Sequence, residues 1–159
     1  RNTKITMEPN PSREATPKRV STSRVIPVER SIIFNVLANP HLHSEIDGSG
    51  TVKGKLDGPE ALHLGDTFKI KMRTWNIPYQ ITNTVVEYEE GFLIAWAHFG
   101  KHRWRYEFTD SNEGTIVTET FDWETAIWPR MIELGKYPKT HLPRMERTLE
   151  RLEAYLLRL

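Results

Sequence analysis

The residues of this chain that could carry acid–base chemistry come from two nearby stretches, FLIAWAHFGKHRWRYEF and GTIVTETFDWE. The first stretch supplies His98 and Arg103, and the second supplies Glu119 and Asp122. Histidine exchanges a proton near neutral pH, and a carboxyl group in an apolar pocket becomes an acid or a base as its surroundings shift its pKa. His98 and Glu119 are therefore the two candidate catalytic residues that we single out.

Glu119 and His98 each have a second, purely structural interpretation. Glu119 would share one face of a strand with Val117, Phe121 and Trp123, and glutamate usually stays near water, so a local twist could expose it. The alternative is that Glu119 faces into an apolar pocket, where an unpaired charge is costly and the carboxyl group needs a partner. A lone histidine in a strand is likewise more often structural than catalytic. The sequence leaves both choices open.

Other chemistries find little support in the sequence. It contains no cysteine, which excludes disulfides, thiolate catalysis and sulfur-ligated metals. His41 and His43 are two positions apart and would not share a helical face, so we predict no metal site. The sequence has no phosphate-binding loop and no nucleophile motif, and we expect no cofactor.

Composition and charge restrict the class of protein further. The 159 residues suffice for one domain, and 22 basic residues balance 21 acidic ones to a net charge of +1. That balance gives no general attraction to nucleic acid, and no apolar run approaches the ~18 residues of a membrane span. We expect a cytoplasmic protein without a nucleic-acid partner, with one domain at residues 19–159 behind a polar extension at residues 1–18.

Hydrophobic periodicity predicts the elements that must position these residues. Residues 29–40 have helical spacing that ends at a proline, and residues 41–47 indicate a short second helix. A period of two then predicts strands, most clearly at FKIKMRT, where Phe68, Ile70 and Met72 alternate with cations. The predicted strands are residues 20–28, 51–56, 68–74, 78–90, 93–99, 102–108 and 114–124.

The C-terminal part of the sequence predicts a long helix that begins at about Pro143. Its apolar stripe recurs every three or four residues, at Leu142, Met145, Leu149, Leu152, Leu156 and Leu159. We expect this stripe to pack on the sheet, and a homodimer seam is the alternative. Residues 126–140 form an insert with several apolar side chains, which predicts a lid or an extra helix.

The register of the aromatic hairpin is open between two pairings. If Gly100 and Lys101 form a two-residue loop, Trp104 lies opposite Ala97, and large rings fill the space beside small methyl groups. If the loop has an odd number of residues, Trp96 joins Trp104 on one face. That face would be very crowded unless it lined a cavity. We expect the aromatic residues of this hairpin to line a pocket.

These features together resemble the START-like (SRPBCC) ligand-binding superfamily, in particular its polyketide cyclase/dehydrase-like branch. The likeness covers about residues 20–159 and includes SRVIPVERSIIFNVLANPHLHSEIDGSGTV, HRWRYEF, GTIVTETFDW and the terminal helix. Ile46 departs from the pattern, because many members have a tryptophan at that position. The positions that fit are Val25, Ile26, Pro27, Phe34, Leu37, Ala38, Pro40 and Asp47.

The resemblance implies an α+β helix-grip fold, in which a seven-stranded antiparallel sheet wraps around the C-terminal helix and two short helices follow the first strand. A twisted sheet cannot touch one straight helix along its whole length, so we expect a cavity between them. The expected function is to bind a small hydrophobic or aromatic ligand, lipid-like or polyketide-like. The candidate ligand-binding residues are Phe34, Phe68, Ile70, Met72, Trp96, Trp104, Tyr106, Phe121, Trp123, Met145 and Leu149.

Two other functions stay open at this point. One is a polyketide cyclase or dehydratase that uses His98 and Glu119 as acid and base in the same cavity. The other is a co-chaperone-like interaction module, which would need an exposed apolar patch rather than an enclosed cavity.

Overall fold

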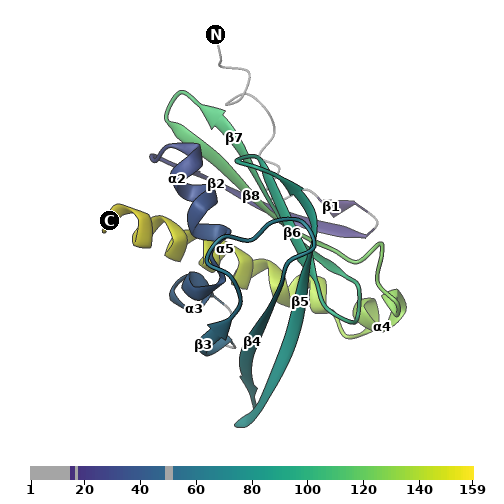
Figure 1. Cartoon of the computed structure of the whole chain (residues 1–159). Helices are drawn as coiled ribbons and strands as arrows, with labels where there is room; N and C mark the ends of the chain where they lie inside the picture. The colour runs from purple at the N-terminus through teal and green to yellow at the C-terminus, as the bar shows by residue number, and fades with distance from the viewer. Residues whose placement is uncertain (1–14, 17, 49–51) are drawn as a thin grey trace.

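The computed structural model describes residues 15, 16, 18–48 and 52–159, so most of the extension predicted at residues 1–18 lies outside the described residues. An antiparallel sheet and a long helix that crosses it dominate the architecture (Figure 1), which confirms the predicted α+β class and terminal helix. The elements in chain order are β1 (Ala15–Thr16), β2 (Arg19–Ile26), α2 (Arg30–Leu37), the 3-10 helix η2 (Pro40–Leu42), α3 (His43–Ile46), β3 (Val52–Asp57), β4 (Thr67–Thr74), β5 (Ile77–Glu89), β6 (Leu93–Ala97), β7 (Arg103–Ser111), β8 (Gly114–Asp122), α4 (Pro129–Leu134) and α5 (Tyr137–Leu157).

The sheet has the strand order β1-β2-β8-β7-β6-β5-β4-β3, and every neighbouring pair is antiparallel. Strands β3 to β8 pair with their neighbours in sequence, while β2 pairs with β8. The predicted count of seven strands is wrong, because Ala15 and Thr16 add the short strand β1 beside β2. Strand β1 was not predicted, since a two-residue strand is too short to show a period.

The hairpin of β6 and β7 adopts the register with an odd-numbered loop. Trp96 lies opposite Trp104 and Ile94 opposite Tyr106, which leaves residues 98–102 as the connection. Lys101 in this connection has a φ of 66°. As a result Trp96, Trp104 and Tyr106 share one face of the sheet, the arrangement that would be crowded without a cavity.

Three short helical segments follow β2, where the resemblance implied two. The chain leaves α2 after Leu37 and turns at Asn39, whose side chain accepts a hydrogen bond from the backbone N–H of His41 at 3.0 Å. This turn opens η2 at Pro40, and α3 follows directly. Pro27 comes immediately after β2, so its missing N–H costs the sheet no ladder hydrogen bond.

Helix α5 begins earlier than predicted. It starts at Tyr137 and contains Pro143 in its interior, so Pro143 does not mark its first turn. The apolar stripe is buried at Met145, Leu149, Leu152 and Leu156, but Leu159 lies beyond the helix and is exposed. The insert before α5 contains the extra helix α4.

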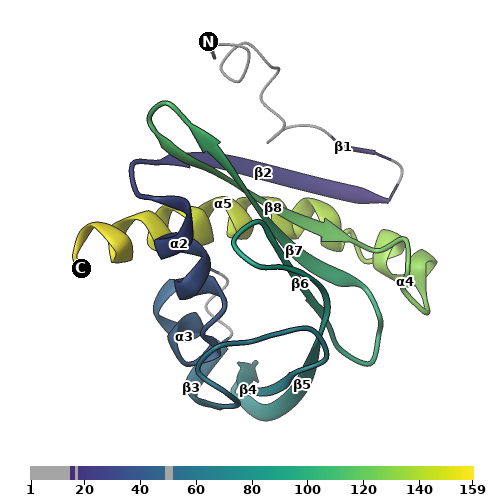
Figure 2. The ribbon, with the colours of Figure 1, turned by 45° about the horizontal axis from the view of Figure 1, so that its top comes forward.

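The sheet curves so that α5 meets only one end of it. Helix α5 packs mainly along β2 and β8 and against α3 and α4, while strands β4 and β5 bend away from it (Figure 2). The volume between α5, α3 and strands β4 to β7 is therefore left for side chains and for a cavity. Within the described residues, no helix has the length and apolar character that crossing a membrane requires.

Candidate functional site

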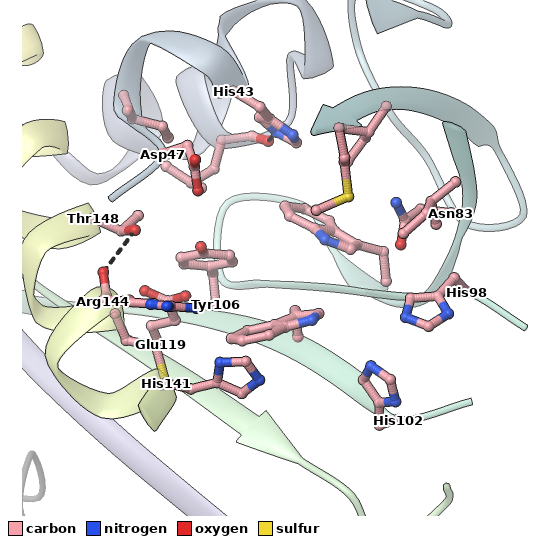
Figure 3. Close-up of a pocket in the computed structure, with 18 residues that line it drawn as sticks. His43, Asp47, Asn83, His98, His102, Tyr106, Glu119, His141, Arg144 and Thr148 are labelled. Carbon is pink, nitrogen blue, oxygen red and sulfur yellow. Dashed lines mark hydrogen bonds between the residues drawn. The ribbon is translucent and has the colours of Figure 1, made fainter. Parts of the chain in front are cut away.

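A cavity of about 280 Å³ lies between α5, α3 and the inner face of the sheet (Figure 3). Its wall combines aliphatic and aromatic side chains with a small number of polar ones, as ligand pockets usually do. The lining residues are Leu37, His43, Ile46, Asp47, Ile70, Met72, Ile81, Asn83, Trp96, His98, His102, Trp104, Tyr106, Glu119, His141, Arg144, Met145 and Thr148.

Several of the predicted ligand-binding residues are part of this wall. They come from four different elements and are Ile70 and Met72 of β4, Trp96 of β6, Trp104 and Tyr106 of β7, and Met145 of α5. The alternation of β4 places Ile70 and Met72 on the inner face, while Lys69 and Lys71 point to solvent. The hairpin register brings the three rings of β6 and β7 to the same wall.

The other predicted ligand-binding residues lie behind the wall and not in it. Phe121 packs under Trp104, with ring centroids 4.7 Å apart, and Trp123 stacks on Phe121 at 5.6 Å. Phe68 meets the edge of Trp96 at 5.4 Å. These residues, together with Phe34 and Leu149, are buried in the packed core next to the wall. The predicted ligand-binding residues that do not line the cavity are Phe34, Phe68, Phe121, Trp123 and Leu149.

Glu119 faces into the cavity and is 3% exposed, so the interpretation that a twist exposes it is wrong. Tyr106 lies directly opposite Glu119 on β7. Among the described residues, Oε1 of Glu119 has no hydrogen-bond partner. Burial, with the negative charge of Asp47 as a smaller cause, raises the pKa of Glu119 to about 8 against the lowering effect of Tyr106.

His43 is the second buried titratable group of the wall. Its ring stacks on Trp96 with centroids 4.9 Å apart, and Nε2 donates a hydrogen bond to the carbonyl oxygen of Leu37 at 2.9 Å. Burial lowers the pKa of His43 to about 4, and the hydrogen bond to Leu37 opposes this shift. His43 is therefore neutral near pH 7 and holds the end of α2 against the cavity wall.

We expect His43 to make the protein sensitive to acid. Because its pKa is about 4 in the folded state and 6.5 when unperturbed, the unfolded chain takes up the proton first as pH falls. Stability is then lost from pH 6.5 downward, by about 1.5 kcal/mol between pH 6.5 and pH 5 from this residue. Urea unfolding of His43→Gln should show a shallower loss over that range than the wild type does. If stability fell equally with pH in the wild type and in His43→Gln, His43 would not be the cause of the loss.

Three further histidines and an arginine line the more open part of the cavity. His98 and His102 meet edge to face at 4.4 Å, and His141 of α5 lies 5.1 Å from Trp104. Desolvation lowers the pKa of His98, and it lowers the pKa values of His102 and His141 to about 4. Arg144 is exposed at this end of α5. The partly open rim is thus built mostly from neutral rings.

The two candidate catalytic residues both reach the cavity but at different ends. Glu119 lies beside α5, while His98 lies at the opposite side of the wall (Figure 3). Nδ1 of His98 accepts a hydrogen bond from the backbone N–H of Gly100 at 3.2 Å, so the neutral ring carries its proton on Nε2. An acid and a base are present, but they do not point toward one another.

Arg103 and Asp122 are on the outer face of the sheet, away from the cavity. Arg105 donates to Glu87 at 2.8 Å and to Asp122 at 3.0 Å, and Arg103 also pairs with Glu87. Hydrogen bonding to Arg105 is the main cause that lowers the pKa of Glu87 to about 2. These side chains tie β5, β7 and β8 together and cannot act in the cavity.

The described residues contain no group of histidine and carboxylate side chains that could hold a metal ion. His41 and His43 donate to different carbonyl oxygens, those of Gly58 and Leu37. The two rings therefore serve separate segments of the chain.

Sequence reasoning missed the polar residues that α3, α5 and β5 bring to the wall. The hydrophobic period of their segments predicts that these residues are exposed or cap a helix. They are Asp47, Asn83, His141, Arg144 and Thr148. Leu37, Ile46 and Ile81 were visible only as ordinary apolar residues. Only the i, i+4 spacing of His141 and Met145, and of Arg144 and Thr148, could have indicated that they flank one side of the helix.

Solved structures of other proteins share the fold of this chain. A solved structure of protein NE0264 from Nitrosomonas europaea superimposes with a TM-score of 0.72 at 15% identity, covering 91% of this chain and 97% of that chain. Protein SSP2350 from Staphylococcus saprophyticus gives a TM-score of 0.61 at 22% identity, over 87% of this chain and 90% of that one. At these identities the likeness shows a shared antiparallel-sheet fold.

The sequence relatives are mycobacterial. The chain is 37% identical over 144 residues to the uncharacterised protein Rv0088 of Mycobacterium tuberculosis strain H37Rv, and 36% identical to MT0096 of strain CDC 1551. Both matches cover 87% of this chain, which spans 64% of the length of these relatives. No protein-family model matches the sequence.

Proposed function

We propose that this protein binds a small hydrophobic or aromatic ligand in the cavity between the sheet and α5, in the manner of a START-like helix-grip domain. The observation that carries the proposal is the cavity itself, about 280 Å³ lined largely by aliphatic and aromatic side chains. Apolar surface buried in such a space contributes roughly 25 cal/mol per Å² to binding. Trp96, Trp104 and Tyr106 contribute rings to the wall, which suits an apolar or aromatic guest.

A cyclase or dehydratase is the second candidate, and Glu119 is the observation that favours it. A carboxyl group with a pKa of about 8 holds its proton at neutral pH and could protonate a bound molecule. His98 would have to act as the base from the other side of the wall. Because the two groups do not converge, binding needs fewer assumptions than catalysis and is the function that we put first.

Filling the cavity should abolish binding without unfolding the protein. Met72 is a half-buried residue of the wall, so Met72→Trp would place a large ring in the space that the ligand needs. We expect the affinity for the neutral fluorescent probe N-phenyl-1-naphthylamine to fall by tenfold or more. The matched control is Lys71→Trp, which adds the same ring one residue away on the outer face and should bind as wild type does. If Met72→Trp binds the probe as well as Lys71→Trp does, the probe is not in this cavity.

The natural ligand can be sought directly. Native mass spectrometry of freshly expressed protein should show a small molecule that leaves on gentle activation, and the Met72→Trp variant should lack it. If neither apolar probes nor cellular extracts yield any bound molecule or raise the melting temperature, the binding proposal fails.

A further inference from the structure

Glu119 lines the cavity and carries one buried carboxyl oxygen without a hydrogen-bond partner. This oxygen is Oε1, which has no partner in the part of the chain that the structure describes, and Tyr106 lies opposite Glu119 on the neighbouring strand. A buried polar atom left unpaired is costly, so such an atom on a cavity wall indicates that a guest supplies the missing partner. The position lies deep in the cavity, because Glu119 and Tyr106 are both almost fully buried.

The proton of the carboxyl group decides what kind of partner fits. Burial and Asp47 keep Glu119 protonated at neutral pH. A protonated carboxyl group has one O–H donor, and no described residue takes a hydrogen bond from Oε1 of Glu119. The partner that the carboxyl group lacks is therefore an acceptor.

The other ionisable groups around Glu119 agree with a neutral guest. His43 and His141 are kept uncharged by desolvation, and the pKa of Tyr106 lies well above its ordinary value. Asp47 and Arg144 bring opposite charges to the wall, so neither sign of guest is favoured overall, and any charged guest would lose its water against aromatic walls. The titratable and charged residues that line the cavity with Glu119 are His43, Asp47, His98, His102, Tyr106, His141 and Arg144.

We propose that the ligand of this cavity is a neutral, flat molecule bearing a carbonyl or similar acceptor oxygen, which takes a hydrogen bond from the carboxyl group of Glu119. This inference rests on the proposed binding function and specifies the chemistry that the site selects. The apolar part of the guest lies against Trp96 and Trp104, and its oxygen points to the Glu119–Tyr106 pair.

Four probes that share one naphthalene ring test the inference on the wild-type protein. They are 2-acetylnaphthalene, 2-ethylnaphthalene, 1-(2-naphthyl)ethylamine and 2-naphthoic acid, with affinities measured by isothermal titration calorimetry. At pH 7 the ketone should bind about fivefold more tightly than the ethyl compound, the value of one good hydrogen bond. At pH 9 this preference should approach one, because most of the Glu119 carboxyl groups have then lost their proton.

Two variants of Glu119 separate the effect of its hydrogen-bond donor from the effect of its size. Glu119→Gln keeps a donor that does not titrate, so its preference for the ketone should be the same at pH 7 and pH 9. Glu119→Leu keeps the size and removes the donor, so its preference should be close to one at both pH values. Circular dichroism and thermal melting check that both variants are folded, and the wild-type preference tests the inference without them.

The possible outcomes have different consequences. Equal binding of ketone and ethyl compound to the wild type at pH 7 would overturn the acceptor inference while leaving an apolar binding cavity. Tighter binding of the amine or of the carboxylate would overturn it in favour of a charged ligand. If none of the four probes binds at either pH, the proposed function itself fails and the inference fails with it.

Discussion

Replacing Glu119 by glutamine should stabilise the protein by about 3 kcal/mol at pH 7. The pKa of Glu119 is about 8 in the folded protein, against 4.5 when unperturbed, because the carboxyl group is buried beside Asp47. Above pH 4.5 the unfolded chain therefore ionises while the folded one keeps its proton. Stability is lost progressively as pH rises from 4.5 to 8. Glutamine has the same shape and no proton to lose, so the variant escapes this loss.

Urea unfolding at pH 4.5, 7 and 8 provides the measurement. The gain from Glu119→Gln should be small at pH 4.5 and should increase with pH, which distinguishes it from a simple packing effect. Glu113→Gln, an exposed substitution at the turn that leads into β8, is the control and should change stability by less than about 0.5 kcal/mol. A gain of the same size at pH 4.5 and pH 8 would show that ionisation is not its cause.

By this reasoning the Glu119 carboxyl group lowers the stability of the fold at neutral pH instead of raising it. Proteins commonly give up stability at positions where a polar group is needed for binding or catalysis. The stability of Glu119→Gln and the ligand affinities are therefore two independent tests of the role of Glu119.

Gly48→Ala should destabilise the protein by about 3 kcal/mol or more, because the new methyl group meets backbone atoms that cannot move aside. A Cβ at this position would lie 2.5 Å from the backbone nitrogen of Thr148 and 2.6 Å from the carbonyl oxygen of Arg144. The close approach also allows Gly48 N–H to donate to Oγ1 of Thr148 at 2.9 Å, while Arg147 donates to the Gly48 carbonyl oxygen at 3.0 Å. These bonds join the end of α3 to α5 at the cavity wall.

Gly65→Ala is the comparison for this effect. A Cβ on Gly65 meets no described atom within 4 Å, but its φ of +87° is unfavourable for alanine, so we expect a loss of about 1–2 kcal/mol. Chemical denaturation of both variants should rank Gly48→Ala as clearly the less stable. The reverse order would mean that the segment after α3 can move away from α5 at little cost, and the wall at Asp47 would then be adjustable.

The sequence predicted the elements of this fold better than it predicted their contacts. The period of two at Phe68–Met72 and the helical spacing from Met145 to Leu156 depend on burial of one face, and both elements formed as expected. The strand β1 and the true start of α5 were missed, since both depend on pairing or packing with distant residues. Pro143 was mistaken for a helix start because a proline is well tolerated there and costly inside a helix.

The cavity wall was predicted only in part for the same reason. Periodicity placed Trp104 and Phe121 on inner faces, but it could not tell which ring lies in front of the other. That order depends on the register of β6 with β7 and on where α5 crosses the sheet. Asp47 and Arg144 come to the wall through the contact of Gly48 with α5, a long-range approach that leaves no local pattern in the sequence.

Pro143 interrupts the backbone hydrogen bonds of α5 where the helix passes the cavity. A proline has no N–H, so the carbonyl oxygen of Lys139 lacks the amide donor that an uninterrupted ladder would supply. Residues beyond this break are anchored by Met145 and Leu149, whereas those before it, including His141, are only partly covered. The part of α5 before Pro143 therefore has less buried surface and one hydrogen bond fewer, and we expect it to be the first part of the helix to unfold locally.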